Sequence, residues 1–564
     1  MKTISHLLAP TLVIMMMLTS LLPVLADESP APDPIPIISE CEVMTITDTS
    51  AIITWITDIE SNTSMRYDTM PLWLRYSQEG ETYDSNGDLA DNGIYHYLEL
   101  TDLRPGTVYF YKAYSSDGSS YLRNFTTLTP PEGDYLFSFA TMNDTHLGSY
   151  RDGNENGKDD NTELVEQVIE EINDMDVAFT IIKGDITHHG LLSEFGKSKD
   201  ALDNLTQDYY PLIGNHDIWA HDESSNVDIE PMGDQYFQDV FGDMLNAAGV
   251  QFPSEEELST YYSFVYEGYR FINMDSVSRW AAPLDNPGGW PGGVFLEGEL
   301  EWLENELAQA TLANEHVMIF MHHPCTETSD NTSIWPFIMT LDNYEATGFR
   351  ELIGNYENVV GVFSGHTHRS LVTYASETGQ LPYSETVSTS DYPCGYNVYK
   401  VYENGYMQSF YKCKLMDLSE SIKSTVMVGN PIVECAEKYY RLGSLQDRNF
   451  VYDNERYVAD EQEQEQDNDD QDSQEIPPIN DESNQNNENP VAEEPNNNTN
   501  LINSLDNQAA TQPNEVELQP DETLNAVNDS EGQHNNILPD WIWAVIVISS
   551  ILFLSILSLR FIHR

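Results

Sequence analysis

Residues 135–146 read YLFSFATMNDTH, an apolar run that ends in an aspartate and a histidine. Four later stretches repeat this arrangement: VAFTIIKGD (177–185), YYPLIGNHD (209–217), VMIFMHHP (317–324) and VVGVFSGHTH (359–368). Short apolar runs that stop at glycine and polar residues predict buried strands followed by loops. In α/β folds such loops collect at one edge of the sheet, where ligands bind. The five stretches therefore predict an α/β domain with a single polar site.

The loops after these runs contain oxygen and nitrogen donors and no thiolate. The candidate ligands are Asp144, His146, Asp185, Asn215, His322, His366 and His368. Carboxylate, amide and imidazole ligands suit two divalent transition metals of the Mn, Fe or Zn type. The alternative, that all of them are hydrogen-bonded polar residues at strand ends, requires five independent coincidences.

The order D-x-H, G-D, G-N-H-D, H-x-P, G-H-x-H resembles the calcineurin-like metallophosphoesterases, over about half of the chain. The resemblance implies a sandwich of two sheets flanked by helices. It also implies a dimetal enzyme that hydrolyses phosphate mono- or diesters by attack of a metal-bound hydroxide. In that pattern Asp185 bridges the two ions. The remaining ligands divide into Asp144, His146 and His368 for one ion, and Asn215, His322 and His366 for the other.

The same resemblance assigns roles beside the metal ligands. His216 would stabilise the phosphoryl charge or protonate the leaving oxygen. Asp217 would orient His216, or would serve as a structural turn residue. His322 is preferred over His323 as the ligand because the family ligand precedes x-Pro. His188 and the next residue, His189, are left open between substrate contacts and supporting or surface groups.

An all-β region precedes the catalytic region. Its strand-like stretches, among them AIITWITD and SMRYD, predict a sandwich. The segment Leu103–Tyr111 resembles a fibronectin type III turn and strand, with Trp55 in the core and Tyr109 as the corner tyrosine. A sandwich before such a catalytic domain resembles the purple acid phosphatase layout. That family has D-x-G first and a metal-bound tyrosine where this chain has His188, so no purple colour is expected.

The rest of the chain divides by composition. TELVEQVIEEIN and GELEWLENELAQA are amphipathic helices between strands. From residue 459 onward Asp, Glu, Asn, Gln and Pro dominate, which predicts a disordered, extended stalk. The expected order is a signal peptide (1–26), a fibronectin type III-like domain (35–128), the phosphoesterase domain (133–416), a C-terminal extension (417–458), the acidic stalk (459–538) and a transmembrane helix (541–559).

The two ends predict a location. An apolar run follows Lys2 and ends at small residues before Asp27, as in a secretory signal, although an uncleaved anchor is the alternative. Residues 541–559 contain no charge, and Arg560 and Arg564 follow on the expected cytoplasmic side. The sequence therefore predicts a single-pass protein of the cell membrane whose catalytic region is extracellular. Cys325 and the four other cysteines leave at least one thiol unpaired.

The formal charge of −69 argues against nucleic acid as a partner, because the chain has no basic patch to contact phosphates. It also favours a high-salt environment, with an ordinary acidic extracellular protein as the alternative. Such charge says nothing about the fold. The expected small-molecule partner is a phosphate ester, and the runner-up function is a cell-surface adhesion or envelope protein that uses the fold as a scaffold.

A calcium site is a separate hypothesis. The run RDGNENGKDDNTE has the order D-x-N-x-N-G-x₅-E of an EF-hand loop. Its ligand positions are Asp152, Asn154, Asn156 and Glu163. A solvated turn that caps the following helix is the alternative.

Overall fold

The structure is a computed structural model of the 564-residue chain. It describes residues 34–148, 159–218, 221–222, 227–228, 233–254, 258–279, 292–326, 340–426 and 440–454. The expected signal peptide (1–26), stalk (459–538) and transmembrane helix (541–559) lie outside these ranges. Within them, no helix has the length and apolar character that crossing a membrane requires.

The N-terminal region is a β-sandwich of two antiparallel sheets, as the sequence predicts. One sheet has the order β1 (Ile38–Ile46), β2 (Ala51–Ser61), β6 (Gly93–Leu100), β5 (Glu81–Tyr83). The other has β4 (Tyr76–Glu79), β3 (Ser64–Asp68), β7 (Val108–Ser115) and β8 (Gly118–Ser119), with β9 (Arg123–Thr126) paired to β7. Trp55 is fully buried between them. The Tyr109 hydroxyl accepts a hydrogen bond from the Arg104 main chain at 2.9 Å, which is the corner contact expected of it.

Two six-stranded sheets form the catalytic region. The first runs β12 (Asp208–Leu212), β11 (Phe179–Lys183), β10 (Tyr135–Met142), β21 (Gly395–Tyr402), β22 (Gly405–Lys412), β23 (Phe450–Asp453). The second runs β15 (Tyr262–Tyr266), β16 (Tyr269–Asn273), β17 (His316–Phe320), β18 (Val359–Ser364), β20 (Tyr383–Glu385), β19 (Leu371–Thr373). Buried aromatic rings join the sheets, for example Phe139 in the first and Phe271 in the second, 5.4 Å apart.

Each of the five apolar runs that precede the candidate ligands is a strand. These are β10, β11 and β12 in the first sheet, and β17 and β18 in the second. Within each sheet these strands pair in parallel, so their carboxyl ends lie at one edge. The loops that carry the candidate ligands therefore meet where the two sheets face each other.

Helices cover the sheets and connect the strands. Their bounds are α2 (Asp160–Asn173), α3 (Leu192–Leu202), α4 (Asn215–Ile218), α5 (Gly233–Ala247), α6 (Glu299–Ala313), α7 (Asn343–Ile353), α8 (Met416–Val426) and α10 (Leu445–Arg448), and a short hairpin pairs β13 (His221–Asp222) with β14 (Val227–Asp228). Helix α2 buries the predicted apolar face that includes Leu164 and Ile172. Asp159 caps it by accepting from the Thr162 N–H, so the helix starts two residues before the predicted stretch.

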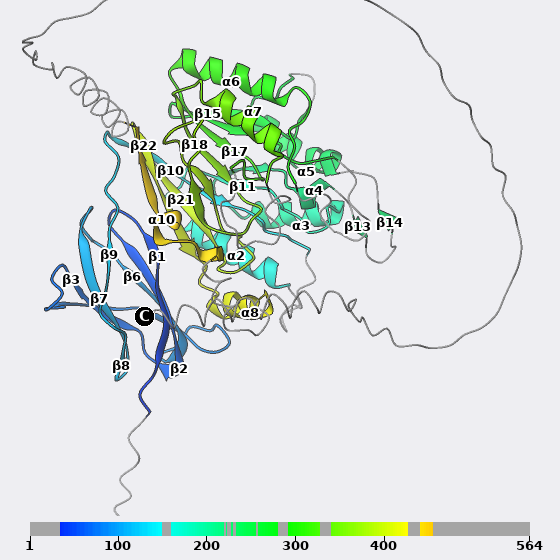
Figure 1. Ribbon diagram of the computed structural model, residues 1–564. Coiled ribbons are helices and arrows are strands. Elements are labelled where there is room, and N and C mark those ends of the chain that lie inside the picture. Colours follow the sequence, from blue (N-terminus) through cyan, green and yellow to red (C-terminus); the bar gives the residue numbers. More distant parts are fainter. Residues whose placement is uncertain are drawn as a thin grey trace, which may run out of the picture. The chain divides into compact units, whose positions relative to one another are not determined.

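The first sheet contains strands from distant parts of the sequence. β21 pairs with β10 although more than 250 residues separate them in the sequence, and β22 lies on the other side of β21 (Figure 1). β23 then pairs with β22, so the segment that the sequence separated as a C-terminal extension supplies an edge strand of this sheet. β22 also contacts the sandwich: Thr45 Oγ1 donates to Phe410 O at 2.6 Å, and Ser409 Oγ donates to Ile46 O at 2.7 Å.

Candidate metal centre

Three of the loops that follow the five strands, those after β10, β11 and β18, have an unusual backbone. Five candidate ligands have positive φ angles: Asp144 (50°), His146 (44°), Asp185 (47°), His366 (66°) and His368 (51°). Residues with a Cβ adopt this region rarely, and when several do so together the strain marks a functional site. These sharp turns direct the ligand side chains of three loops toward one point, where the side chains of Asn215 and His322 also lie.

Two glycines allow the loops to approach each other. A Cβ on Gly214 would lie 2.1 Å from the Asp185 main-chain nitrogen. Gly184 has a φ of +77°, and a Cβ there would lie 2.5 Å from His322 Nδ1. The glycines of the G-D and G-N-H-D motifs are therefore required for the close contact between loops, and a larger residue at either position would push the ligands apart.

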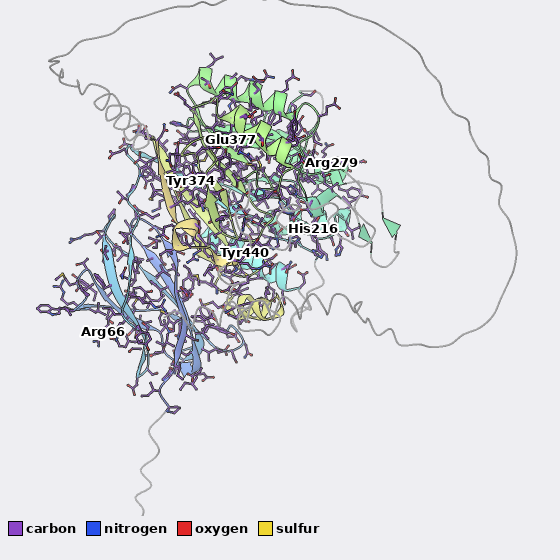
Figure 2. The ribbon with its side chains drawn as sticks, in the orientation of Figure 1. Arg66, His216, Arg279, Tyr374, Glu377 and Tyr440 are labelled. Carbon is purple, nitrogen blue, oxygen red and sulfur yellow. The ribbon has the colours of Figure 1, made fainter. Side chains whose placement is uncertain are left out.

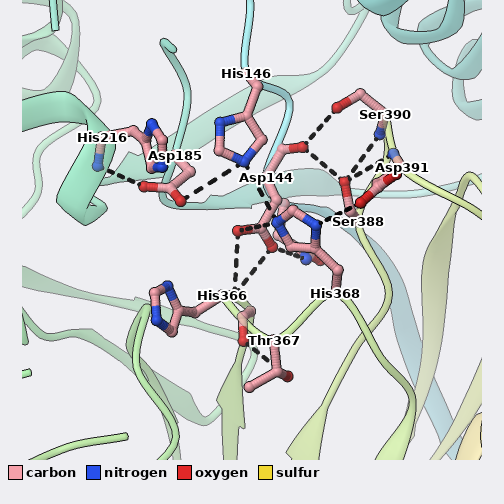
Figure 3. Close-up of polar contacts among 12 residues, drawn as sticks. Asp144, His146, Asp185, His216, His366, Thr367, His368, Ser388, Ser390 and Asp391 are labelled. Carbon is pink, nitrogen blue, oxygen red and sulfur yellow. Dashed lines mark hydrogen bonds and ion pairs between the residues drawn. The ribbon is translucent and has the colours of Figure 1, made fainter. Parts of the chain in front are cut away.

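One half of the centre is formed by Asp144 and His146, from the loop after β10, and by His368, from the loop after β18. His368 Nε2 lies 3.4 Å from Asp144 Oδ1 and 3.3 Å from His146 Nε2. Figure 3 shows the side chains of Asp144 and His146, from the loop after β10, next to that of His368, from the loop after β18. The Asp144 carboxylate also accepts from the His366 main-chain N–H at 3.0 Å, which fixes its position relative to the last loop.

The other half contains Asn215, His322 and His366. His322 Nε2 lies 3.1 Å from both Asn215 Oδ1 and His366 Nδ1. The other nitrogen of His322 donates to the Lys183 carbonyl at 3.1 Å, which turns Nε2 toward the cluster. His323 also offers a ligand atom within 4.8 Å of His322 and His366, but its Nδ1 lies 3.0 Å from Ser276 Oγ. His322 is the histidine of this pair that lies beside both Asp185 and Asn215.

Asp185 lies between the halves. Its Oδ2 is 3.2 Å from His322 Nε2 and 3.7 Å from His146 Nε2. Its Oδ1 accepts from the His216 main-chain N–H at 2.8 Å. A single carboxylate oxygen therefore faces ligands of both halves, as a bridging ligand must.

The charges of the centre are strongly perturbed. Burial would raise the pKa of Asp185, but the surrounding histidines outweigh it and hold that pKa well below its usual value. Burial opposes protonation of His322, yet contact with Asp185 raises its pKa to about 9. Burial likewise opposes protonation of His368, and Asp144 and Asp391 raise its pKa to about 9. Protons on these two histidines balance the buried carboxylates, and a bound cation would replace them.

The donor set fits metal ions. In the second half Asp185 Oδ2, Asn215 Oδ1 and His366 Nδ1 all surround His322 Nε2 at 3.1–3.2 Å. One proton on that nitrogen cannot satisfy three acceptors, whereas a cation can bind all four atoms. Asp144, His146 and His368 likewise bring one ligand atom each within 4.8 Å of one another.

His216 lies beside the centre and does not contact Asp217 as expected. Its Nδ1 donates to the His188 carbonyl at 2.8 Å. The Asp217 carboxylate accepts instead from the main-chain N–H groups of Thr187 at 2.8 Å and Gly214 at 2.9 Å. Asp217 thus connects the G-D loop to the G-N-H-D loop, which corresponds to the structural role that the sequence left open for it. The His188 carbonyl, in turn, orients His216.

The adjacent histidines have different surroundings. His189 is buried, and its Nδ1 lies 2.9 Å from Glu194 Oε1 of α3. The His188 ring stacks on His216 with centroids 5.2 Å apart and also contacts His146. His189 therefore supports the loop, and His188 lies where it can reach a molecule bound to the centre. His216, which lies in α4, is labelled in Figure 2.

The calcium hypothesis and Cys325, which follows His322 by three residues, remain to be considered. Asp152, Asn154 and Asn156 of the calcium hypothesis lie outside the described residues, and Glu163 is in the first turn of α2. Cys325 is buried, and burial raises its thiol pKa to about 12, which disfavours the thiolate that a metal would need.

Sequence reasoning missed Asp391. Its Oδ2 lies 3.0 Å from His368 Nδ1 and accepts from Arg441 Nη1 at 2.6 Å. A lone aspartate in the run STSDYP has no spacing that marks it, and Arg441 lies in the segment expected to be an extension. The only sequence signal is indirect, since histidine ligands commonly donate their second N–H to a carboxylate.

Comparison with known families gives two matches. Residues 137–370 match the calcineurin-like phosphoesterase family model, and residues 41–127 match the model of the purple acid phosphatase N-terminal domain. The first range includes all seven candidate ligands, and the second coincides with the sandwich. Asp391 and Arg441 lie beyond both.

Individual relatives are distant. A probable cyclic nucleotide phosphodiesterase of Ruthia magnifica subsp. Calyptogena magnifica is 21% identical over 276 residues, which are 48% of this chain and 94% of that protein. A probable glycerophosphodiester phosphodiesterase of Arcobacter nitrofigilis is 25% identical over 197 residues, 34% of this chain and 57% of that protein. A dimetal phosphatase structure from Danio rerio aligns with a TM-score of 0.36 at 17% identity, covering 50% of this chain and 97% of that one.

Proposed function

Because this chain is a metal-dependent phosphoric ester hydrolase with a calcineurin-like phosphoesterase domain at residues 137–370, we propose that it cleaves phosphodiesters at the centre around Asp185. The observation that supports this most directly is the position of Asp185 Oδ2, which faces His146 in one half and His322 in the other. Such sharing holds two cations in the pair that phosphoryl transfer uses.

The proposed ligands are the seven residues found together in the structure. Asp144, His146 and His368 would hold one ion, Asn215, His322 and His366 the other, and Asp185 both. When bound, the two divalent ions would activate water and neutralise charge on the phosphoryl oxygens. The metal would be Mn, Fe or Zn.

His216 would act on the leaving group. Its Nδ1–H is held by the His188 carbonyl, so Nε2 is the atom that can carry a proton to the departing oxygen. The neighbouring His188 would contact the phosphoryl group or the second ester substituent.

Diesters are proposed over monoesters because of the relatives. The cyclic nucleotide and glycerophosphodiester enzymes, and a sphingomyelin phosphodiesterase of Dictyostelium discoideum that is 22% identical over 217 residues, are all named as phosphodiesterases. The test loads the full-length chain with Mn²⁺ and compares bis-p-nitrophenyl phosphate with p-nitrophenyl phosphate. A higher kcat/KM for the diester supports the proposal. Turnover of the monoester alone contradicts the substrate class, and turnover of neither favours the scaffold reading.

We further propose that the enzyme is extracellular and anchored by residues 541–559. The support is the charge-free apolar run with arginines after it and the secretory pattern at residues 1–26. Protease treatment of intact cells should release the catalytic domain by cutting between residues 459 and 538. An enzyme that stays protected until the cells are lysed would contradict this location.

A further inference from the structure

The ring of His368 has two different environments. Its Nε2 faces Asp144 and His146, and its Nδ1 lies 3.0 Å from Asp391 Oδ2 (Figure 3). An imidazole that donates its Nδ1–H to a carboxylate is fixed in the tautomer that presents the Nε2 lone pair. The contact with Asp391 therefore sets both the orientation of the ring and its ability to bind a cation.

Asp391 is itself held in place by hydrogen bonds that lead to Asp144, one of the candidate ligands. Its main-chain N–H donates to Ser388 Oγ at 3.0 Å, and Ser388 Oγ donates to the Asp144 carbonyl at 2.8 Å. Ser390 Oγ donates to the same carbonyl at 2.9 Å. The loop that carries Asp391 is thus bound to the residue whose carboxylate faces His368.

Arg441 holds Asp391 from the opposite side. Its Nη1 donates to Asp391 Oδ2 at 2.6 Å, and the two side chains are only 14% and 8% exposed. The Arg441 carbonyl accepts from the Ser370 N–H at 2.9 Å, two residues after His368. Before it, Tyr440 lies 4.9 Å from the Arg369 guanidinium (Tyr440 is labelled in Figure 2). Residues 440 and 441 thus hold the last ligand loop through side chain and backbone.

The segment that supplies Arg441 is also bound to the sandwich. Arg448 donates to the Leu442 carbonyl at 2.8 Å and to the Val43 carbonyl of β1 at 2.9 Å. Asn449 Oδ1 accepts from the Ile46 N–H at 3.0 Å. Hydrogen bonds from β1 to Arg448 and from Arg448 to Leu442, the backbone from Leu442 to Arg441, and the contact of Arg441 with Asp391 therefore connect the sandwich to His368.

We propose that Asp391, held by Arg441, is a positioning residue for the ion bound by Asp144, His146 and His368. The segment 440–449, which lies beyond the matched phosphoesterase range, thereby completes one of the two metal sites. This inference rests on the proposed function, since it takes His368 to be a ligand. Loss of an outer carboxylate of this kind weakens metal affinity about 10- to 100-fold.

The test measures metal binding by the full-length chain rather than turnover alone. Apoprotein is titrated with Mn²⁺ in a calorimeter, and bound metal is counted after dialysis against graded chelator. In Asp391→Asn one ion should be retained as in the wild type, and the other should bind about 10- to 100-fold more weakly. Arg441→Gln should lower the affinity for the same ion. Arg441→Lys keeps the positive charge, so its affinity for that ion should be closer to that of the wild type.

A matched control separates positioning from general stability. Glu306→Gln breaks another buried ion pair, in which Arg270 lies 2.6 Å from Glu306 and both side chains are 6% exposed. This variant should lose stability and bind both ions as the wild type does. Equal affinity for both ions in Asp391→Asn would overturn the inference. If Asp391→Asn does not fold, unchanged affinities in folded Arg441→Gln would do so.

The outcome also separates this inference from the proposed function. A wild-type chain that binds fewer than two ions contradicts the dimetal assignment and this inference with it. A wild-type chain that binds two ions, with variants that bind them equally well, contradicts only the role of Asp391.

Discussion

The main-chain N–H of His216 donates to Oδ1 of Asp185 at 2.8 Å. This hydrogen bond occupies one carboxylate oxygen and leaves Oδ2 facing His146 and His322. The proposed proton donor and the proposed bridging ligand are therefore linked through the backbone. The sequence order G-N-H-D brings this about, since the residue after ligand Asn215 supplies the N–H.

Asp185→Asn should abolish turnover and metal content together. The substitution keeps the shape of the side chain but removes the negative charge that holds two cations close to each other. Metal analysis and turnover of bis-p-nitrophenyl phosphate provide the measurement. Asp203→Asn, which alters an exposed aspartate paired with Lys199, is the control and should change neither. Wild-type turnover in Asp185→Asn would exclude the bridging role.

His216→Gln should retain both metal ions and reduce kcat about 10²-fold for poor leaving groups. The reduction should be smaller for a p-nitrophenolate leaving group, because that group departs without a proton. The measurement is a series of aryl diesters of increasing leaving-group pKa. An equal reduction across the series would assign His216 to charge stabilisation instead of proton donation. His188→Gln, which alters the stacked neighbour, should leave the slope of the series unchanged.

The sandwich should lose stability at mildly acidic pH because of His96. This side chain is fully buried between the hydroxyls of Thr57 and Thr63, and burial lowers its pKa from 6.5 to about 4. The unfolded chain therefore takes up the proton first. The contribution is fully present above pH 6.5 and is lost as the pH falls toward 4, by up to about 3 kcal/mol.

Denaturant unfolding between pH 4 and 7 tests this dependence. The unfolding free energy of the wild type should fall relative to that of His96→Gln, which has no titrating group at this position. Parallel pH profiles of the two proteins would show that His96 does not titrate on unfolding.

Removal of metal should destabilise the catalytic region. Each ion present at 100 times its Kd stabilises the folded state by about 2.7 kcal/mol, so loss of two ions should lower Tm by about 5 °C or more. Differential scanning calorimetry with and without chelator measures the effect, and excess Mn²⁺ should reverse it. An unchanged Tm would mean that the cluster binds no metal under those conditions.

Calcium should raise Tm independently of the transition metals if residues 152–163 bind it. Asp152→Ala combined with Glu163→Ala should remove the calcium-dependent shift and leave the Mn²⁺-dependent shift intact. A wild-type Tm that does not respond to calcium would favour the alternative, a solvated turn before the helix that Asp159 caps.

Local sequence was sufficient to predict the five strands that precede the candidate ligands and two of the helices, α2 and α6. Apolar runs and glycines act over a few residues, so β10, β11, β12, β17 and β18 occur where the periodicity places them. The five motifs predicted that their side chains would meet, because parallel strands end at a common edge. Trp55 and Tyr109 likewise predicted the sandwich from short-range patterns.

Only the tertiary structure decided how the site is supported. Asp391 reaches His368 across 23 residues, Arg441 reaches Asp391 across 50, and Arg448 reaches Val43 across 405. The tertiary structure also decided the partner of His216, because its Nδ1 donates to the His188 carbonyl, 28 residues earlier, and not to the adjacent Asp217. Such partners have no periodic signal, because their meeting depends on how the sheets, loops and returning C-terminal segment pack. The sequence by itself thus determined which atoms can bind metal, and packing determined which polar groups hold those atoms in place.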